Sequence, residues 1–251
     1  MRPQSSRDGA DAGHLISASF PGNAGVMTEN PTPYPDHRFD ALLFDMDGTL
    51  LTSIESAERV WSRWLTRYGF DPVEILPRIH GVQTLESIRR LDIPGIDPQR
   101  EADWIAREEL ADLDGVRAID GAVEFVAGLP HDGWAIVTSA TRPLAEARLA
   151  AAGLVPPPLF ITAEDIAHGK PAPDCYIEAA RRLGADVTQC LVFEDAPAGI
   201  ASGRTAGAEV VVITATHTHP ITTGYPHIRD YRGLTTAHRD GRMMLQPRTT
   251  A

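Results

Sequence analysis

The stretch ALLFDMDGTL, from Ala41 to Leu50, decides the fold of this chain. Its first four residues form an apolar run that predicts a short buried strand. A buried strand that ends in acids is typical of parallel α/β sheets, whose active sites lie at the carboxyl ends of the strands. Residues two apart share one side of a strand, so we expect Asp45 and Asp47 to face the same pocket. Two close carboxylates call for a shared proton or a cation, and hard oxygen ligands favour magnesium. For this stretch alone, a strand followed by an ordinary Asp-Gly turn is the other interpretation.

Helical and strand-like segments alternate through the second half of the chain. Apolar, strand-like runs lie near residues 134–138, 159–161, 190–193 and 209–213, and segments with helical spacing separate them. Strands that alternate with helices of this length indicate a mainly parallel sheet with helices on both faces. We therefore predict an α/β fold with a Rossmann-like parallel sheet as its core. The tail after His217 carries weak signals, among them a short strand at residues 243–245.

A block without strand signals, residues 53–117, interrupts this pattern. Apolar residues recur there at helical spacing, beginning with a helix that Ser53 can cap. We predict a small all-helical domain, with Trp61 and Trp64 in its own core, inserted into an α/β core formed by residues 38–52 and 118–251. Residues 1–37 are rich in Gly, Pro, Ser, Asn and Asp and show little apolar periodicity, so we predict a disordered extension there.

The composition argues against several classes of protein. The formal net charge of -11 is unlike that of a nucleic-acid-binding protein, which normally presents a basic face. No apolar run approaches the ~18 residues that indicate a membrane-spanning helix. The two cysteines, Cys175 and Cys190, form no CxxC motif, which fits a protein without disulfides in a reducing cytoplasm. We therefore expect a cytoplasmic protein that binds neither nucleic acid nor membrane.

Polar side chains follow four of the predicted strands. They are, in chain order, Asp45 and Asp47, Thr138 and Ser139, Lys170, and Glu194 and Asp195. The carboxyl ends of parallel strands lie along one edge of a sheet, so we expect these groups to converge.

These residue types suit phosphoryl transfer. One carboxylate can be the nucleophile, and a second acid can protonate the leaving oxygen and later activate water. A hydroxyl and a lysine can hold the phosphate oxygens, and a further acid can complete a magnesium site. Each feature alone also has a structural explanation: Ser139 as a helix cap, Lys170 as a solvated charge, and Glu194 with Asp195 as caps of the next helix. Their combination favours the chemical explanation.

Four motifs carry a family resemblance. They are DMDGTL at 45–50, TSATR at 138–142, GKPAPD at 169–174 and FEDAPAGI at 193–200. In this order they resemble the haloacid dehalogenase superfamily of phosphohydrolases, in the branch with a helical cap inserted after the first motif. The resemblance covers about residues 39–213. Within the superfamily, ERVWSRWLTRYGFDP at 58–72, IHG at 79–81 and FEDAPAGI are similar to sugar- and polyol-phosphate phosphatases, which include 2-deoxyglucose-6-phosphate, glycerol phosphate and hexitol phosphate phosphatases.

The resemblance implies roles for four acids. Asp45 would be the nucleophile that becomes the aspartyl phosphate, and it would also bind magnesium. Asp47 would be the general acid and base, with its backbone carbonyl as a metal ligand. Asp195 would bind the metal directly, and Glu194 through a bound water. The dehalogenase branch itself needs no acid two positions after the nucleophile, so Asp47 favours phosphate chemistry.

The resemblance also implies which groups bind phosphate. The hydroxyl of Ser139 would do so together with the backbone amide of Ala140, and Thr138 is the less favoured choice. Lys170 would be the cation of the third motif.

Cap residues contact the substrate in proteins of this kind. Some relatives carry an arginine after the His-Gly pair of the cap, where this chain has Gln83. His80 and Gln83 are therefore our candidates for specificity, although a helix-start turn with a surface glutamine explains them equally well. Arg142 either holds a second anionic or hydroxyl group or faces solvent.

Together these features predict a magnesium-dependent phosphatase that hydrolyses a small sugar or polyol phosphate through an aspartyl phosphate. The cap would close over the substrate and exclude water. One alternative is a β-phosphoglucomutase, which returns the phosphoryl group to a sugar. Another is a regulator that binds a phosphometabolite without catalysis, which would have no use for the general acid Asp47. We expect a monomer with Mg²⁺ as its cofactor.

Overall fold

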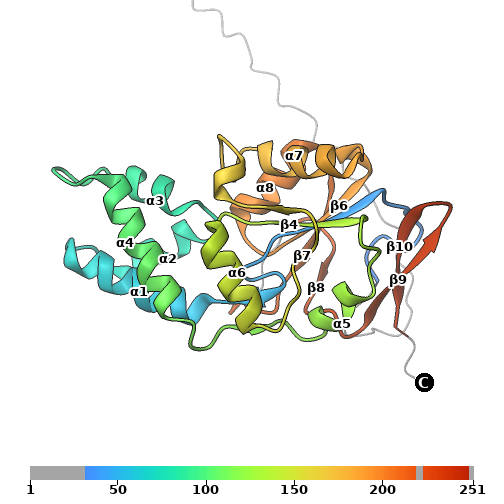
Figure 1. Cartoon of the computed structure of the whole chain (residues 1–251), viewed down its shortest axis with the longest axis horizontal. Coiled ribbons are helices and arrows are strands. Elements are labelled where there is room, and N and C mark those ends of the chain that lie inside the picture. Colours follow the sequence, from blue (N-terminus) through green and yellow to red (C-terminus); the bar gives the residue numbers. More distant parts are fainter. Residues whose placement is uncertain (1–31, 219–222, 249–251) are drawn as a thin grey trace, which may run out of the picture.

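The computed structural model describes residues 32–218 and 223–248 of the chain (Figure 1). Its centre is a six-stranded parallel sheet in the order β5-β4-β1-β6-β7-β8. The strands are β1 (Ala41–Phe44), β4 (Trp134–Val137), β5 (Phe160–Ile161), β6 (Cys190–Glu194), β7 (Glu209–Ile213) and β8 (His227–Ile228). This sheet and its flanking helices confirm the predicted α/β, Rossmann-like fold.

Both faces of the sheet are covered (Figure 1). One face packs against α7 (Asp174–Leu183) and α8 (Pro197–Ala206); the other packs against α5 (Ala122–Ala127), α6 (Arg142–Ala151) and the antiparallel hairpin of β9 (Leu234–Arg239) and β10 (Arg242–Pro247). Short 3-10 helices lie at η1 (Ala163–Asp165) and η2 (Val187–Gln189). In β1, Leu42 and Phe44 enter one hydrophobic cluster, whereas Ala41 and Leu43 enter the other. A strand buried on both faces reads as an unbroken apolar run, which explains the sequence ALLF.

The helical insertion joins the core through a short antiparallel ribbon. The chain leaves through β2 (Leu51–Thr52) and returns through β3 (Arg117–Ala118), which pair with each other. Between them lie α1 (Ile54–Arg67), α2 (Pro72–Ile79), α3 (Thr84–Arg90) and α4 (Pro98–Ala111), to the left of the sheet in Figure 1. We call residues 53–117 the cap. Its helices enclose a hydrophobic cluster of their own, in which Trp61 and Trp64 are buried.

The structure differs from the sequence-based predictions near both chain ends: residues around Tyr34 pack on the core, and β9 is an additional strand. Residues 1–31, most of the predicted extension, lie outside the described residues. Its last part packs onto the core, because the hydroxyl of Tyr34 donates to the carbonyl oxygen of Val210 at 3.1 Å and the Tyr34 ring packs edge-on against Phe39. The weakly signalled strand near residue 243 is present as β10, and β9 beside it had no clear signal in the sequence.

Both cysteines are buried and unpaired, Cys175 on α7 and Cys190 on β6. Within the two described ranges, no helix is both long enough and apolar enough to cross a membrane.

Candidate active site

Three carboxylates and one lysine meet at the carboxyl edge of the sheet. Ligand oxygens of Asp45, Glu194 and Asp195 lie within 4.8 Å of one another. The Nζ of Lys170, from the loop before α7, donates to Asp45 Oδ1 at 2.6 Å and to Glu194 Oε1 at 2.7 Å. Because β1 lies between β4 and β6, the sheet order itself brings these strand ends together. The structure thus assembles four residues that the sequence predicted to converge.

The cluster is largely buried, with Asp195 partly exposed, and it carries more negative than positive charge. Burial raises the pKa of Asp45 to about 7; the ammonium of Lys170 opposes this shift and the carboxylate of Glu194 adds to it. Burial alone would lower the pKa of Lys170, but the charges of Asp45 and Glu194 outweigh it and hold that pKa above its usual value. A further positive charge would therefore stabilise the ionised cluster.

Two oxygens of the cluster have no hydrogen-bond partner among the described residues. They are Asp45 Oδ2 and Asp195 Oδ1, and both are buried. Buried acceptors without a partner are costly, and carboxylate oxygens are the ligands that Mg²⁺ takes. Burial, and then repulsion by Asp45, raises the pKa of Asp195 well above its usual range. The residues present therefore fit a divalent cation that contacts Asp45 and Asp195.

Glu194, in contrast, has no free oxygen. Its Oε1 accepts hydrogen bonds from Lys170 and, at 2.9 Å, from the hydroxyl of Tyr176. Its Oε2 accepts from the backbone amides of Asp195 at 3.0 Å and Ala196 at 3.2 Å. A carboxylate whose lone pairs already bind protein donors is poorly suited to direct coordination, which agrees with the water-mediated role that the resemblance implies.

Gly48 lets Asp195 approach the loop of the first motif. Its φ of 92° lies in the left-handed region that favours glycine. A Cβ at this position would also overlap the carboxylate of Asp195. The glycine of DMDGTL is therefore required by both backbone conformation and space.

Asp47 stands apart from the cluster and lines a cavity between core and cap. Its carboxylate is not among the clustered acids of the described residues, so its backbone carbonyl is the group left for the implied metal contact. Its Oδ1 accepts hydrogen bonds from Ser53 Oγ at 2.6 Å and from Arg148 Nη1 at 3.2 Å. Ser53 was predicted to cap α1, but its side chain makes no cap hydrogen bond and donates to this carboxylate instead. Arg148 lies 101 positions further along the chain, and no local sequence pattern indicated it.

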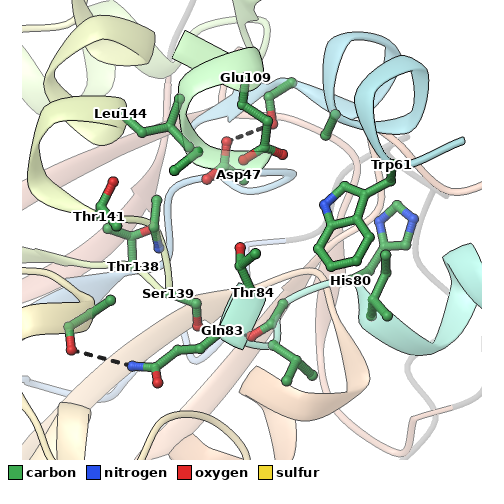
Figure 2. A pocket seen from close by; sticks show the side chains of 18 of the residues that line it. Asp47, Trp61, His80, Gln83, Thr84, Glu109, Thr138, Ser139, Thr141 and Leu144 are labelled. Carbon is green, nitrogen blue, oxygen red and sulfur yellow. Dashed lines mark hydrogen bonds between the residues drawn. The ribbon is translucent and has the colours of Figure 1, made fainter. Parts of the chain in front are cut away.

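The hydroxyls of the second motif have different partners. Ser139 Oγ, predicted to bind phosphate, donates to the carbonyl oxygen of Gly81 in the cap at 2.9 Å. Thr138 Oγ1 accepts from the backbone amide of Ala140 at 3.1 Å, and its own proton has no acceptor within the part of the chain that the structure describes. Thr138, Ser139 and Ala140 all line the cavity, and Figure 2 shows the first two. The hydroxyl with a proton available for a phosphate oxygen is therefore that of Thr138, which the sequence ranked second.

The cavity has a volume of about 390 Å³, within the range of small-molecule sites. Both predicted cap candidates, His80 and Gln83, line it, and so does Trp61 (Figure 2). His80 Nε2 lies 3.5 Å from Glu58 Oε1, also in the cap. Gln83 Nε2 donates to the carbonyl oxygen of Ala163 in the core at 3.4 Å. The glutamine therefore takes part in docking the cap as well as lining the cavity.

Arg142 does not line the cavity. Its Nη2 donates to the carbonyl oxygen of Phe160 at 3.1 Å and to Asp165 Oδ2 at 3.0 Å. This placement argues against a substrate contact for Arg142. The guanidinium that α6 presents to the cavity is that of Arg148.

Comparison with known proteins agrees with this geometry. Residues 39–207 match the family model described as haloacid dehalogenase-like hydrolase. The chain belongs to this family.

Among curated members of the family, several similar proteins are phosphatases. Hexitol phosphatase A of Escherichia coli is 41% identical over 182 residues, covering 71% of this chain and 84% of that protein. 2-Deoxyglucose-6-phosphate phosphatase 2 of Saccharomyces cerevisiae is 34% identical over 207 residues, covering 73% and 83%. Glycerol-1-phosphate phosphohydrolase 2 of the same yeast is 31% identical over 192 residues, covering 71% and 76%. These matches confirm the predicted relationship and show that this haloacid dehalogenase-like hydrolase is a phosphoric monoester hydrolase.

Solved structures show the same architecture. A family hydrolase from Deinococcus radiodurans R1 with bound phosphate and sodium is 30% identical with a TM-score of 0.56, covering 77% of this chain and 91% of that chain. A hydrolase from Pseudomonas syringae, 24% identical, has a TM-score of 0.66 and covers 76% and 93%. The second match shows the shared fold.

Proposed function

We propose that this hydrolase is a magnesium-dependent phosphatase that cleaves small sugar or polyol phosphate monoesters through an aspartyl phosphate on Asp45. One observation carries the proposal: the two acids of the first motif have separate environments. Both acids line the same cavity, as their spacing in the sequence predicts, but Asp45 belongs to the buried cluster and is held by Lys170, whereas Asp47 lies outside that cluster. A held nucleophile and a separate acid that faces the substrate are the two groups that this two-step reaction needs.

The two acids divide the proton transfers between them. In the first step a carboxylate oxygen of Asp45 attacks phosphorus, the bond from phosphorus to the ester oxygen breaks, and Asp47 gives its proton to the departing oxygen. In the second step Asp47 takes a proton from a water that attacks the aspartyl phosphate. This step releases inorganic phosphate and restores both residues to their starting states.

Other groups of the site hold the phosphate. The hydroxyl of Thr138 is the donor whose proton is available within the described residues, and the amide of Ala140 orients it by donating to its oxygen. Lys170 donates to Asp45, Val137 and Glu194 and places its positive charge next to the nucleophile. Donors fixed in place before the reaction stabilise the charge that builds on the phosphate oxygens. A magnesium ion held by Asp45 and Asp195 would supply the positive charge that balances the carboxylates and the phosphate.

Further acidic groups line the cavity outside the carboxylate cluster. Glu58 and Asp103 of the cap and Glu164 of the core contribute carboxylates to the lining. A second phosphate or carboxylate on the substrate would be repelled by them unless a cation were available.

Among the described residues, the two that line the cavity and can carry positive charge are both engaged. Arg148 pairs with the carboxylates of Asp47 and Glu109. Burial lowers the pKa of His80, against the influence of Glu58, and so favours its neutral form. The cavity charges therefore favour a substrate whose non-reacting part is a neutral, hydroxyl-rich group, as in the sugar and polyol phosphates named for the relatives. The same charges disfavour a mutase, because the bisphosphate that primes it carries a second phosphate.

The test is phosphate release from matched substrates by the purified chain. Hexitol, 2-deoxyglucose and glycerol monophosphates represent neutral substrates, whereas a phosphogluconate and a sugar bisphosphate add a second anionic group. We expect release from at least one neutral substrate, dependent on Mg²⁺, abolished by excess EDTA and absent in Asp45→Asn. Asp132→Asn, at an exposed acid in the loop before β4, should behave like the natural chain.

Three results would count against the proposal. Release that survives in Asp45→Asn would remove Asp45 as the nucleophile. Faster release from the bisphosphate than from the neutral esters would contradict the charge argument. Sugar-phosphate isomerisation that needs a bisphosphate primer and yields no free phosphate would establish the mutase.

A further inference from the structure

Arg148 connects the cap to the proposed general acid. It lies on α6 of the core, with only 5% of its surface exposed. Its Nη1 is 3.2 Å from Asp47 Oδ1, and its Nη2 is 3.3 Å from Oε1 of Glu109, on helix α4 of the cap. Figure 2 shows Asp47 and Glu109 at the same part of the cavity. One guanidinium thus bridges a carboxylate of the core and a carboxylate of the cap.

This bridge depends on the position of the cap. Glu109 is 4% exposed, and Arg148 is the cation that pairs with it among the described residues. A buried charge is strongly unfavourable once its partner is withdrawn. Because Glu109 belongs to the cap and Arg148 to the core, the ion pair is complete only while α4 packs against α6, as it does here.

The bridge also decides which oxygen of Asp47 faces the reaction. Ser53 and Arg148 both donate to Oδ1. A carboxylate held at one oxygen from two sides has little freedom to rotate, and its other oxygen is left for the substrate. Since Asp47 lines the cavity, Oδ2 is the atom that can carry the proton to the leaving oxygen.

An arginine in a substrate cavity can also act as an anion-binding group. In this chain Nη1 of Arg148 donates to Asp47, and Nη2 lies 3.3 Å from Oε1 of Glu109 as an ion pair; neither Nη2 nor Nε makes a hydrogen bond within the described residues. We propose that Arg148 is a positioning residue that ties Glu109 of the cap to Oδ1 of Asp47 and so directs Oδ2 towards the leaving oxygen when α4 packs on α6. The inference rests on the proposed phosphatase function, in which Asp47 is the general acid.

The experiment compares leaving groups that do and do not need a proton. A hexitol or sugar monophosphate releases a basic alkoxide, which requires protonation, whereas p-nitrophenyl phosphate releases a stable aryl oxide. The comparison uses kcat/KM, because this parameter covers only the steps up to release of the first product and is unaffected by hydrolysis of the aspartyl phosphate. The ratio of the two kcat/KM values within one preparation also cancels any loss of folded protein.

Arg148→Gln removes the positive charge and leaves a side chain that lacks the two terminal nitrogens with which Arg148 contacts both Asp47 and Glu109. We expect kcat/KM for the sugar monophosphate to fall about 10²-fold, the lower end of the usual contribution of a general acid, and that for p-nitrophenyl phosphate to fall less than about threefold. Asp47→Asn should show the same selectivity more strongly. Arg148→Lys, which keeps the charge but not the fork, should recover part of the loss.

Three further variants separate the bridge from its surroundings. Glu109→Gln should produce a smaller loss with the same selectivity, and the double variant with Arg148→Gln should lose no more than Arg148→Gln alone, because both changes break one connection. Arg142→Gln is the matched control: it removes an arginine of the same helix that does not line the cavity, and the ratio should stay unchanged.

Other outcomes would overturn the inference. An equal fall for both substrates in Arg148→Gln would indicate a packing role. A selective rise in KM for the sugar phosphate with kcat unchanged would indicate that Arg148 binds the substrate. If Asp47→Asn lacked the selectivity, or if the natural chain hydrolysed neither substrate, the proposed function itself would fail, whatever the result for Arg148.

Discussion

Ser139 in the core donates a 2.9 Å hydrogen bond to the carbonyl oxygen of Gly81 in the cap. The bond joins the second motif to the loop between α2 and α3, which also supplies His80 and Gln83 to the cavity. The same loop packs closely on the core at a second point, since a Cβ on Gly81 would lie 2.9 Å from the Cβ of Ala196. The second motif therefore takes part in docking the cap as well as in lining the site.

The first prediction separates the two hydroxyls of the second motif. Thr138→Val removes the hydroxyl whose proton is available to phosphate, and we expect kcat/KM to fall by about 10²-fold or more, as for the loss of one preorganised donor. Ser139→Ala removes a neutral hydrogen bond to the cap, worth about 1 kcal/mol, so kcat/KM should fall by less than about tenfold. Steady-state kinetics on one sugar monophosphate decide the matter; a larger loss in Ser139→Ala would restore the sequence-based assignment of Ser139 to phosphate binding.

The second prediction concerns the close approach of the cap loop. Gly81 has a φ of 75° and Gly69 a φ of 78°, so alanine should cost each site about 1–2 kcal/mol of unfolding free energy through backbone strain. Among the described residues, a Cβ on Gly69 would meet nothing within 4 Å, whereas one on Gly81 would press against Ala196. We expect denaturant unfolding to show at least as large a loss in Gly81→Ala as in Gly69→Ala, and only Gly81→Ala should raise KM. Equal kinetics in the two variants would mean that this contact does not matter for substrate binding.

The third prediction concerns the metal. Asp195→Asn removes one negative charge from a buried cluster of carboxylates, so without metal the variant should melt at a higher temperature than the natural chain. Magnesium at 100 times its Kd should stabilise the natural chain by about 2.7 kcal/mol and the variant far less. Thermal melts with EDTA or with graded Mg²⁺ measure both effects. An unchanged magnesium response in Asp195→Asn would exclude Asp195 as a direct ligand.

The fourth prediction concerns pH. Burial lowers the pKa of His80 below its usual value of 6.5, although Glu58 opposes the shift. The unfolded chain therefore takes up a proton at a higher pH than the folded chain, so this contribution to stability is present above pH 6.5 and is lost as the pH falls. Between about pH 7.5 and about pH 5.5, the urea midpoint should fall less in His80→Gln than in the natural chain. His131→Gln, at an exposed histidine, is the control and should keep the full pH dependence.

The sequence alone was sufficient for five of the six strands of the sheet, all except β8, and for the edge at which its functional groups lie. The run ALLF is apolar without alternation because β1 is buried on both faces. Acids that directly follow such a strand must emerge at the carboxyl edge, and the order of strands and helices then implies that the other strand ends lie beside them. For this reason Asp45, Lys170, Glu194 and Asp195 could be expected to meet before any coordinates were known.

Only the tertiary structure decided which partner each polar side chain takes. Ser53 had a local explanation as a helix cap, but its hydroxyl reaches Asp47; Ser139 resembled a phosphate ligand, but its hydroxyl reaches the cap. Arg148 lies 101 positions from Asp47 and follows no pattern of the motif. Helices and strands produce a periodic pattern of apolar residues along the chain, so a sequence can reveal them. The contacts of Asp47 depend instead on how α4 packs on α6 and on where the ends of long side chains such as Arg148 lie. The sequence therefore determined the edge of the sheet at which the chemistry lies, and the packing of the cap on the core determined how Asp47 is held there.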